Sequence, residues 1–152
     1  MPQEQDFSRD VIAVQAVLFK SLRVADEKNW NTQATLYADE VTIDFGGVQP
    51  SKSITPADLA SWSAAAYALV KTMHLQMSVE VTINGDEATS RSYGHARHER
   101  TDTHDFWHIY AQYENAYLRT SEGWKISRIK MTPVFQEGNP RLLEESAAAA
   151  TS

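Results

Sequence analysis

Three ionisable side chains, Asp26, His74 and His98, are of the types that proton transfer at neutral pH requires. A histidine can take and return a proton near pH 7, and a carboxylate bonded to its ring holds the tautomer and stabilises the charged form. Asp26 follows Leu18 and Leu22 at helical spacing, which places it on the inward stripe of a predicted helix. A buried carboxylate there needs a partner such as histidine. The alternative is a solvated aspartate in the polar turn that follows.

The strand that contains His74 pairs with one that contains two competing histidines, His95 and His98. A two-residue turn at Asn84-Gly85 would place His74 opposite His95. A bulge or a three-residue loop would shift the register by one and put His98 on the face of His74. Residue types alone leave both alternatives open.

The histidines do not have the spacing of metal ligands. His95 and His98 are three residues apart, so on one strand they point to opposite faces. His104 and His108 share parity near the aspartates of TDTHD (101–105), but His104 is expected in that loop. The chain has no glycine-rich phosphate loop, GxSxG elbow or Walker sequence. We therefore predict no metal and no cofactor.

The first elements predicted along the chain, which must position these groups, are helices. The apolar spacing predicts a helix over 8–26 with Ser8 as its N-cap, and a second helix from Asn29 or Trp30 to Ala38. A short strand at 41–45 stops at Gly46-Gly47, and residues 50–53 are predicted as loop. Thr55 and Pro56 open a third helix that runs to about Val70.

Long strands follow the helices. Alternating apolar residues and turn signals predict strands at 71–83, 87–100, 106–120 and 124–135, joined as hairpins. This order predicts an α+β fold in which a curved antiparallel sheet wraps around the N-terminal helices as a cone-shaped barrel. The chain is expected to form a single domain over 1–152, with an ordered core at about 6–136 and a flexible tail at 137–152.

Composition excludes several classes of function. The 152 residues carry a formal charge of −6 without a basic cluster, which argues against nucleic-acid binding. The absence of cysteine excludes thiolate chemistry and fits a cytoplasmic location. The polar first ten residues are not a secretory signal, and the apolar run at 64–70 is too short to span a membrane.

The sequence resembles the nuclear transport factor two-like superfamily, and within it the SnoaL-like and scytalone dehydratase-like branch. The resemblance covers residues 8–135, and four segments carry it: VADEKNWNTQATLYADEVTIDF (24–45), TMHLQM (72–77), GDEATSRSYGHARHER (85–100) and GWKISRIK (123–130). It implies a cystatin-like fold. It also implies a lyase of the dehydratase or cyclase type, although the superfamily includes binding and assembly proteins as well.

The resemblance also implies a site. Asp26, His74 and His98 match the acid–base group of scytalone dehydratase, and this match favours His98 over His95. Asn115 matches a pocket asparagine. Two tyrosines that act on the substrate carbonyl are unmatched, because Ala25 and Phe45 stand in their places.

Aromatic side chains are expected to line the cone, since a small-molecule pocket is mostly apolar. Tyr113 is a candidate substitute for the missing tyrosines, and Tyr37 is another. The predicted substrate-binding residues are Trp30, Tyr37, Phe45, Trp107, Tyr113 and Asn115.

The expected ligand is a small hydrophobic or hydroxylated molecule, such as a cyclic ketone or an aromatic or polyketide-like compound. The alternative is a non-catalytic ligand-binding or assembly domain, like the small subunits of ring-hydroxylating dioxygenases, with a pocket plugged by side chains. The convex sheet face, expected to expose Tyr110 and Ile126, predicts a homodimer or homotrimer.

Overall fold

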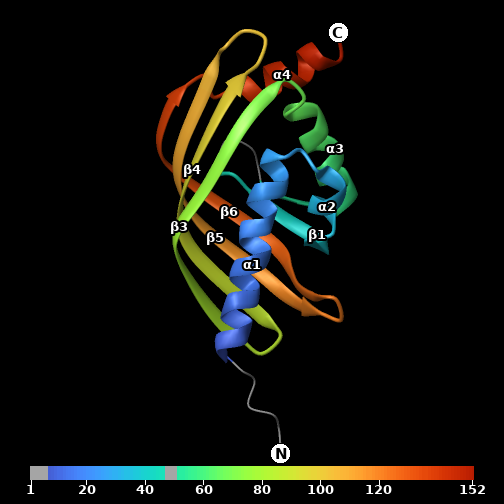
Figure 1. Ribbon diagram of the computed structural model, residues 1–152, viewed down its shortest axis with the longest axis vertical. Coiled ribbons are helices and arrows are strands. Elements are labelled where there is room, and N and C mark those ends of the chain that lie inside the picture. Colours follow the sequence, from blue (N-terminus) through green and yellow to red (C-terminus); the bar gives the residue numbers. More distant parts are fainter. Residues whose placement is uncertain (1–6, 47–50) are drawn as a thin grey trace, which may run out of the picture.

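A computed structural model of the protein describes residues 7–46 and 51–152, and its helices lie on one side of a long, twisted sheet (Figure 1). The elements in chain order are α1 (Phe7–Asp26), α2 (Trp30–Ala34), β1 (Tyr37–Asp44), β2 (Lys52–Ile54), α3 (Pro56–Ala66), β3 (Val70–Asn84), β4 (Glu87–Arg100), β5 (Phe106–Thr120), β6 (Gly123–Gly138) and α4 (Leu142–Ala150).

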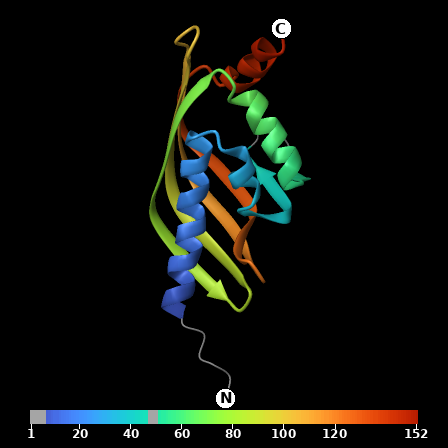
Figure 2. The same ribbon diagram turned by 45° about the vertical axis from the view of Figure 1, so that its right-hand side comes forward.

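The sheet has six strands in the order β2-β1-β6-β5-β4-β3. β1 pairs in parallel with β6, whereas the other neighbours are antiparallel, so the predicted antiparallel sheet has one parallel pair among the described strands. The sheet does not close into a barrel, because β2 and β3 remain as separate edges. It curves around α1 and leaves its convex side bare in the part of the chain described (Figure 2). The predicted α+β class with a curved sheet is confirmed.

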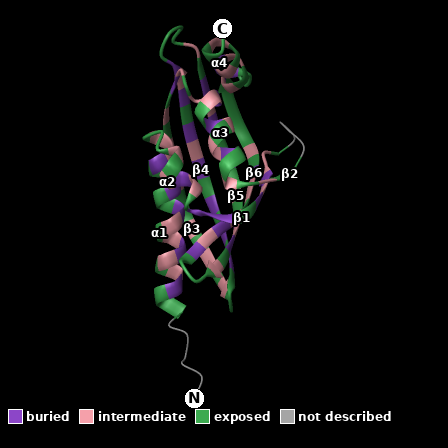
Figure 3. Ribbon diagram, turned by 90° about the vertical axis from the view of Figure 1, so that its right-hand side faces the viewer, coloured by how far each residue is buried: buried purple, intermediate pink, exposed green. Residues whose placement is uncertain are grey.

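The core lies between the helices and the concave face of the sheet, where buried residues follow the strands at every second position (Figure 3). Val14 and Leu18 of α1 pack there against Tyr117 and Ile126. Ile126 was expected on the convex face, but it is buried. The turn between β5 and β6 is the reason: Thr120 pairs with Gly123, and this register puts Ile126 opposite the buried Tyr117 on the concave face.

A second register shift, between β3 and β4, decides which histidine enters the core. The hairpin closes with Asn84 opposite Glu87, and the register then slips between Met77 and Glu80. Ser78 lies in this bulge with a φ of 53°. Beyond it, Thr72 pairs with His98, and so His74 and His98 share the concave face. The bulge alternative was correct, and His95 lies outside.

An ion pair fixes α1 across the sheet at the end remote from Asp26. Both terminal nitrogens of Arg119 donate to Asp10 at 2.8 Å, and the indole of Trp124 donates to the same carboxylate at 3.2 Å. The guanidinium of Arg119 also lies 4.4 Å from the centre of the Trp124 ring. Because α1 is one rigid helix of 20 residues, this anchor also fixes where Asp26 lies.

Several predicted boundaries differ from the structure. Ser8 already lies within α1, so it is not an N-cap. α2 ends at Ala34, since Tyr37 begins β1, and α3 ends at Ala66 rather than Val70. The loop predicted at 50–53 includes most of β2, while its first residue, Pro50, lies outside the described residues, as does Gly47.

The predicted flexible tail is a further difference. β6 continues to Gly138, and α4 packs on the domain with Leu142 completely buried. Leu142 joins Val70, Trp107 and Ile109 in a second apolar cluster, and this contact orders the segment. Within residues 7–46 and 51–152, no helix is both long enough and apolar enough to cross a bilayer.

Candidate functional site

A cavity of about 560 Å³ lies between the concave face of the sheet and helices α1 to α4. Its lining is mostly apolar, with a few polar groups, which is the usual character of a site for a small organic molecule. His74 and His98 line it, and so do all six predicted substrate-binding residues: Trp30, Tyr37, Phe45, Trp107, Tyr113 and Asn115.

Asp26, the last residue of α1, meets His74 at the wall of this cavity. The His74 Nδ1 atom lies 2.6 Å from Asp26 Oδ1, and the His74 backbone N–H donates to Oδ2 at 3.0 Å. The Thr72 hydroxyl donates to Oδ1 at 2.8 Å. Burial raises the pKa of Asp26, but these hydrogen bonds outweigh it and leave the pKa below its ordinary value. The carboxylate is therefore ionised and held in one orientation.

The bond to Asp26 fixes the tautomer of His74. An ionised carboxylate only accepts hydrogen bonds, so Nδ1 must carry the proton. In the neutral ring Nε2 then has a free lone pair. Since His74 lines the cavity and Asp26 holds its other edge, the arrangement provides an oriented proton acceptor.

His98 lies deeper, and its environment is different. Its Nδ1 is 3.1 Å from the backbone oxygen of Trp107, and its ring stacks on the Trp107 ring at 4.8 Å. Burial is the main reason that the pKa of His98 falls to about 3, with the neighbouring His74 adding to the effect. His98 is therefore neutral. Because a carbonyl oxygen only accepts, Nδ1 holds the proton and Nε2 is a hydrogen-bond acceptor.

The two pocket histidines are close and nearly perpendicular to each other. Their ring centroids are 5.5 Å apart, with an interplanar angle of 89°. Asp26 bonds to His74 and not to His98, so the three predicted residues form a dyad and a separate neutral ring rather than one chain.

Tyr67 is a pocket residue that the sequence analysis missed. It caps the C-terminus of α3 and lines the cavity, with its ring centroid 6.3 Å from that of His74 and 6.0 Å from that of His98. Burial raises the pKa of Tyr67 well above its ordinary value, so the hydroxyl keeps its proton. Its hydroxyl has no hydrogen-bond partner among the described residues. Tyr67 is thus a free donor beside both histidines.

The two tyrosines proposed from sequence are less suited to that role. The Tyr113 hydroxyl is already paired, since it donates to the sulfur of Met131 at 3.3 Å, and burial raises its pKa to about 12. Tyr37 lines the cavity but is buried within the main core cluster. A signal for Tyr67 did exist in the sequence, since WSAAAY places Trp62 and the tyrosine five residues apart near a helix end.

Asn115 adds an unpaired acceptor to the lining. Its side chain is buried, and its Oδ1 atom has no hydrogen-bond partner in the described part of the chain. Nearby polar pairs are satisfied: Ser90 with Tyr117 at 2.8 Å, and Ser92 with Gln76 at 2.8 Å. A buried acceptor without a partner is costly unless water or a ligand supplies a donor.

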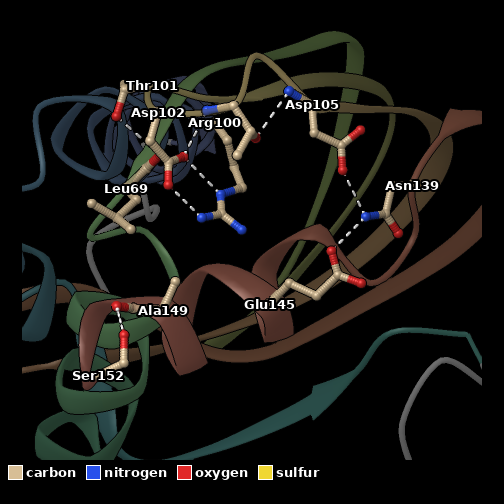
Figure 4. Close-up of polar contacts among 10 residues, drawn as sticks. Leu69, Arg100, Thr101, Asp102, Asp105, Asn139, Glu145, Ala149 and Ser152 are labelled. Carbon is tan, nitrogen blue, oxygen red and sulfur yellow. Dashed lines mark hydrogen bonds and ion pairs between the residues drawn. The ribbon is translucent and has the colours of Figure 1, made fainter.

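Helix α4 closes one end of the cavity, to which Leu143, Glu144 and Ala147 contribute side chains. Asn139 ties this helix to the loop between β4 and β5. Its Nδ2 donates to both Asp105 and Glu145 at 2.8 Å, and an ion pair between Arg100 and Asp102 braces the same loop (Figure 4). The segment expected to be flexible is therefore part of the pocket wall.

The other histidines lie away from the pocket. His95 and His108 lie on the convex face with their rings 6.1 Å apart, and His104 is an exposed turn residue. Across residues 7–46 and 51–152, no three histidine, aspartate or glutamate side chains are grouped as a metal site would need.

The curved, open sheet folded over helices places the chain in the class of α+β proteins with the cystatin-like fold, which is the fold named for an NTF2-like protein from Novosphingobium aromaticivorans (18% identity, TM-score 0.69; 83% and 82% covered). Within that class, a family model described as the SnoaL-like domain matches residues 7–130. The chain belongs to the SnoaL-like family.

Solved structures agree with this fold. The Kfla4162 protein from Kribbella flavida is 27% identical, with a TM-score of 0.84 over 91% of this chain and 99% of that one. A protein from Novosphingobium aromaticivorans DSM 12444, provisionally assigned as a scytalone dehydratase, is 16% identical (TM-score 0.75; 85% and 87% covered). A hexachlorocyclohexane dehydrochlorinase is also 16% identical (TM-score 0.70; 84% and 87% covered). No curated protein matches the sequence.

Proposed function

We propose that the protein is a cofactor-free lyase that removes water from a hydroxylated cyclic ketone or a related aromatic or polyketide-like compound. The observation that carries this proposal is the bond between Asp26 and His74 at the wall of an apolar cavity. A buried carboxylate that fixes the tautomer of an imidazole is the usual arrangement for a general base.

In the proposed reaction, His74 Nε2 takes a proton from the carbon next to the substrate carbonyl. The electrons of that C–H bond move toward the carbonyl oxygen to give an enolate, and Asp26 stabilises the resulting imidazolium. When the carbonyl re-forms, a carbon–carbon double bond replaces the bond to the β-hydroxyl group. The imidazolium returns its proton to that leaving oxygen, so water departs and His74 is neutral again.

Tyr67 and His98 have different roles in this proposal. The Tyr67 hydroxyl would donate a hydrogen bond to the enolate oxygen, which is the role of the unmatched tyrosines. His98 would accept a hydrogen bond from a substrate hydroxyl through Nε2. His98 would not protonate the leaving group, because its one proton is bonded to the Trp107 carbonyl.

Two structural relatives support an elimination. The names of the provisional scytalone dehydratase and of the dehydrochlorinase both describe the removal of a small molecule from a substrate. The alternative of an assembly domain predicted a plugged interior, and a cavity of about 560 Å³ argues against it. Binding without turnover remains the competing outcome of the test.

The test is a turnover assay with cyclic β-hydroxyketones, including fused-ring ones, in which the conjugated product is followed by absorbance and water loss by mass spectrometry. We expect activity in the wild type and a loss of about 10²–10⁴-fold in kcat/KM for Asp26→Asn. The matched control is Glu99→Gln, which alters a carboxylate paired with the exposed His104 at 3.6 Å. Substrate binding without product, or equal activity in Asp26→Asn, would reject the lyase in favour of a binding protein.

A further inference from the structure

Thr72 shares one oxygen of Asp26 with the ring of His74. The Thr72 hydroxyl donates to Oδ1 at 2.8 Å, and the His74 Nδ1 atom lies 2.6 Å from the same oxygen. The backbone N–H of His74 donates to the other oxygen at 3.0 Å. Three donors therefore converge on one carboxylate, and two successive inward-facing residues of β3 supply all of them. A hydroxyl has a single proton, and that of Thr72 is used in this bond.

Thr72 reaches the candidate site only through Asp26. It lies two residues before His74 on the concave face of β3, directly opposite His98 in β4. The described residues that line the cavity include both histidines but not Thr72. A substrate in the cavity would thus contact His74 and not Thr72, so an influence of the threonine on the reaction must pass through the carboxylate.

The position of Asp26 makes this bond important. A carboxylate at the C-terminus of a helix is disfavoured by the helix dipole, and Asp26 is the last residue of α1. Hydrogen bonds donated to a carboxylate stabilise its ionised form, and the bond from Thr72 is one of those that hold the pKa of Asp26 below its ordinary value. If Asp26 took up a proton, it would no longer be the acceptor that fixes the tautomer of His74.

We propose that Thr72 is a positioning residue for the dyad: its hydroxyl holds Oδ1 of Asp26 against the ring of His74 and keeps the carboxylate in its ionised, accepting form. The effect of Thr72 on turnover rests on the proposed lyase function, whereas its effect on Asp26 does not. The two can therefore be tested separately.

The other ionisable groups around Asp26 stay in place when Thr72 is changed. The bond between Arg119 and Asp10 holds α1 at its opposite end, so the helix does not depend on Thr72 for its position. The groups that face or flank the carboxylate are His74 of β3, His98 of β4, Tyr67 at the end of α3, and Arg23, Glu27 and Lys28 beside it in the chain.

The first experiment follows the Asp26 carboxyl carbon by NMR between pH 7 and pH 4, with Asp26→Asn to assign the signal. Thr72→Val keeps the branched shape of the side chain and removes the hydroxyl. We expect its Asp26 to be more protonated at pH 4 than that of the wild type, because one donor to the carboxylate is lost. Thr72→Ser, which keeps the hydroxyl and loses the methyl group, should restore the wild-type titration. Thr82→Val makes the same change at an exposed position of β3 and is the matched control.

The outcomes of this titration separate a role of the hydroxyl from one of packing. A packing role predicts the reverse pattern, with Thr72→Val like the wild type and Thr72→Ser altered. That pattern, or an equal change in Thr82→Val, would overturn the proposal. This readout needs no substrate, so it holds even if the protein proves not to be a lyase.

The second experiment measures the pH dependence of elimination in the same variants. On the acid limb of the profile, kcat/KM for Thr72→Val should be about two- to tenfold below that of the wild type at the same pH, in keeping with the loss of one hydrogen bond. KM on the plateau should be unchanged, because Thr72 does not line the cavity. An acid limb that coincides with the wild-type one would overturn the role in turnover. Absence of turnover in the wild type would instead reject the lyase and leave the NMR result standing.

Discussion

The same sheet carries two pairs of histidines, one on each face, and only the inner pair both lines the cavity and has short Nδ1 bonds to oxygen. His74 and His98 lie 5.5 Å apart on the concave face, and His95 and His108 lie 6.1 Å apart on the convex face. Each inner ring has a short bond from Nδ1 to an oxygen, 2.6 Å to Asp26 and 3.1 Å to the Trp107 carbonyl. The closest carboxylate to His108 is Glu137, at 3.7 Å.

The two pairs have the same residue type and nearly the same separation, so the difference lies in the hydrogen bonds of their rings. The inner rings are held in known tautomers by acceptors that cannot donate, so both Nε2 atoms accept from the cavity. The Nε2 atoms of His95 and His108 are buried without a partner in the described residues, and neither residue lines the 560 Å³ cavity. Replacing one residue at a time on each face can test this contrast.

The largest effect should come from His74. In His74→Asn the amide nitrogen can still donate to Asp26, but the atom corresponding to Nε2 is lost. We expect kcat/KM for the elimination to fall about 10³–10⁴-fold, since the general base is removed. His108→Asn makes the same change on the outer face and should keep wild-type kcat/KM. Equal losses in both variants would mean that the two pairs do not differ in function.

His98 should make the fold sensitive to acid. Its pKa is about 3 in the folded state, below the ordinary histidine value of about 6.5, so the unfolded chain binds the proton first. The contribution of this lowered pKa to the free energy of unfolding is fully present above about pH 6.5. It is lost as the pH falls from there toward 3, by about 1.4 kcal/mol per pH unit. Urea unfolding at several pH values gives the slope of the free energy of unfolding against pH. Over this window the slope for His98→Asn should be smaller than that of the wild type by the equivalent of about one proton. Identical slopes would contradict a buried, neutral His98 ring.

Tyr67 should have the smallest effect. Tyr67→Phe removes the free hydroxyl but keeps the ring that contacts Trp30 and Trp62 at centroid distances of 5.7 and 6.2 Å. We expect kcat to fall about tenfold or more with the free energy of unfolding unchanged within about 0.5 kcal/mol. Tyr93→Phe on the convex face is the control and should leave kcat unchanged. A loss confined to KM would assign Tyr67 to substrate binding alone.

The sequence predicted the long strands well because their signals are local. Strands 87–100 and 106–120 have the predicted bounds, since alternation and turn residues define them. The parallel pairing of β1 with β6 and the packing of α4 depend on contacts distant in the chain. α4 in particular lacks a side-chain cap, and its packing depends on the burial of Leu142 and on the bond from Asn139 to Glu145.

The candidate site, too, has some features with local sequence signals and others that depend on contacts between distant parts of the chain. The helical stripe pointed to Asp26, and the family resemblance pointed to both histidines. The choice between His95 and His98 could not be made from residue types, because it depends on one extra residue in β3. Tyr67 was missed because the third helix was predicted to run to Val70. Its actual end at Ala66 leaves the tyrosine at the cap, where the chain turns toward the sheet.

The extra residue at Ser78 has an evolutionary consequence. It shifts the pairing of β3 with β4 by one residue, so the β3 residues before the bulge point to the faces opposite to those that an unbroken hairpin would give them. Deletion of this one residue would exchange the faces of the β3 residues that precede it. Met73 and Leu75 would turn inward and His74 outward, although none of these residues is substituted. Among proteins that share this hairpin, a single insertion or deletion can therefore bring a histidine into the cavity lining or remove it.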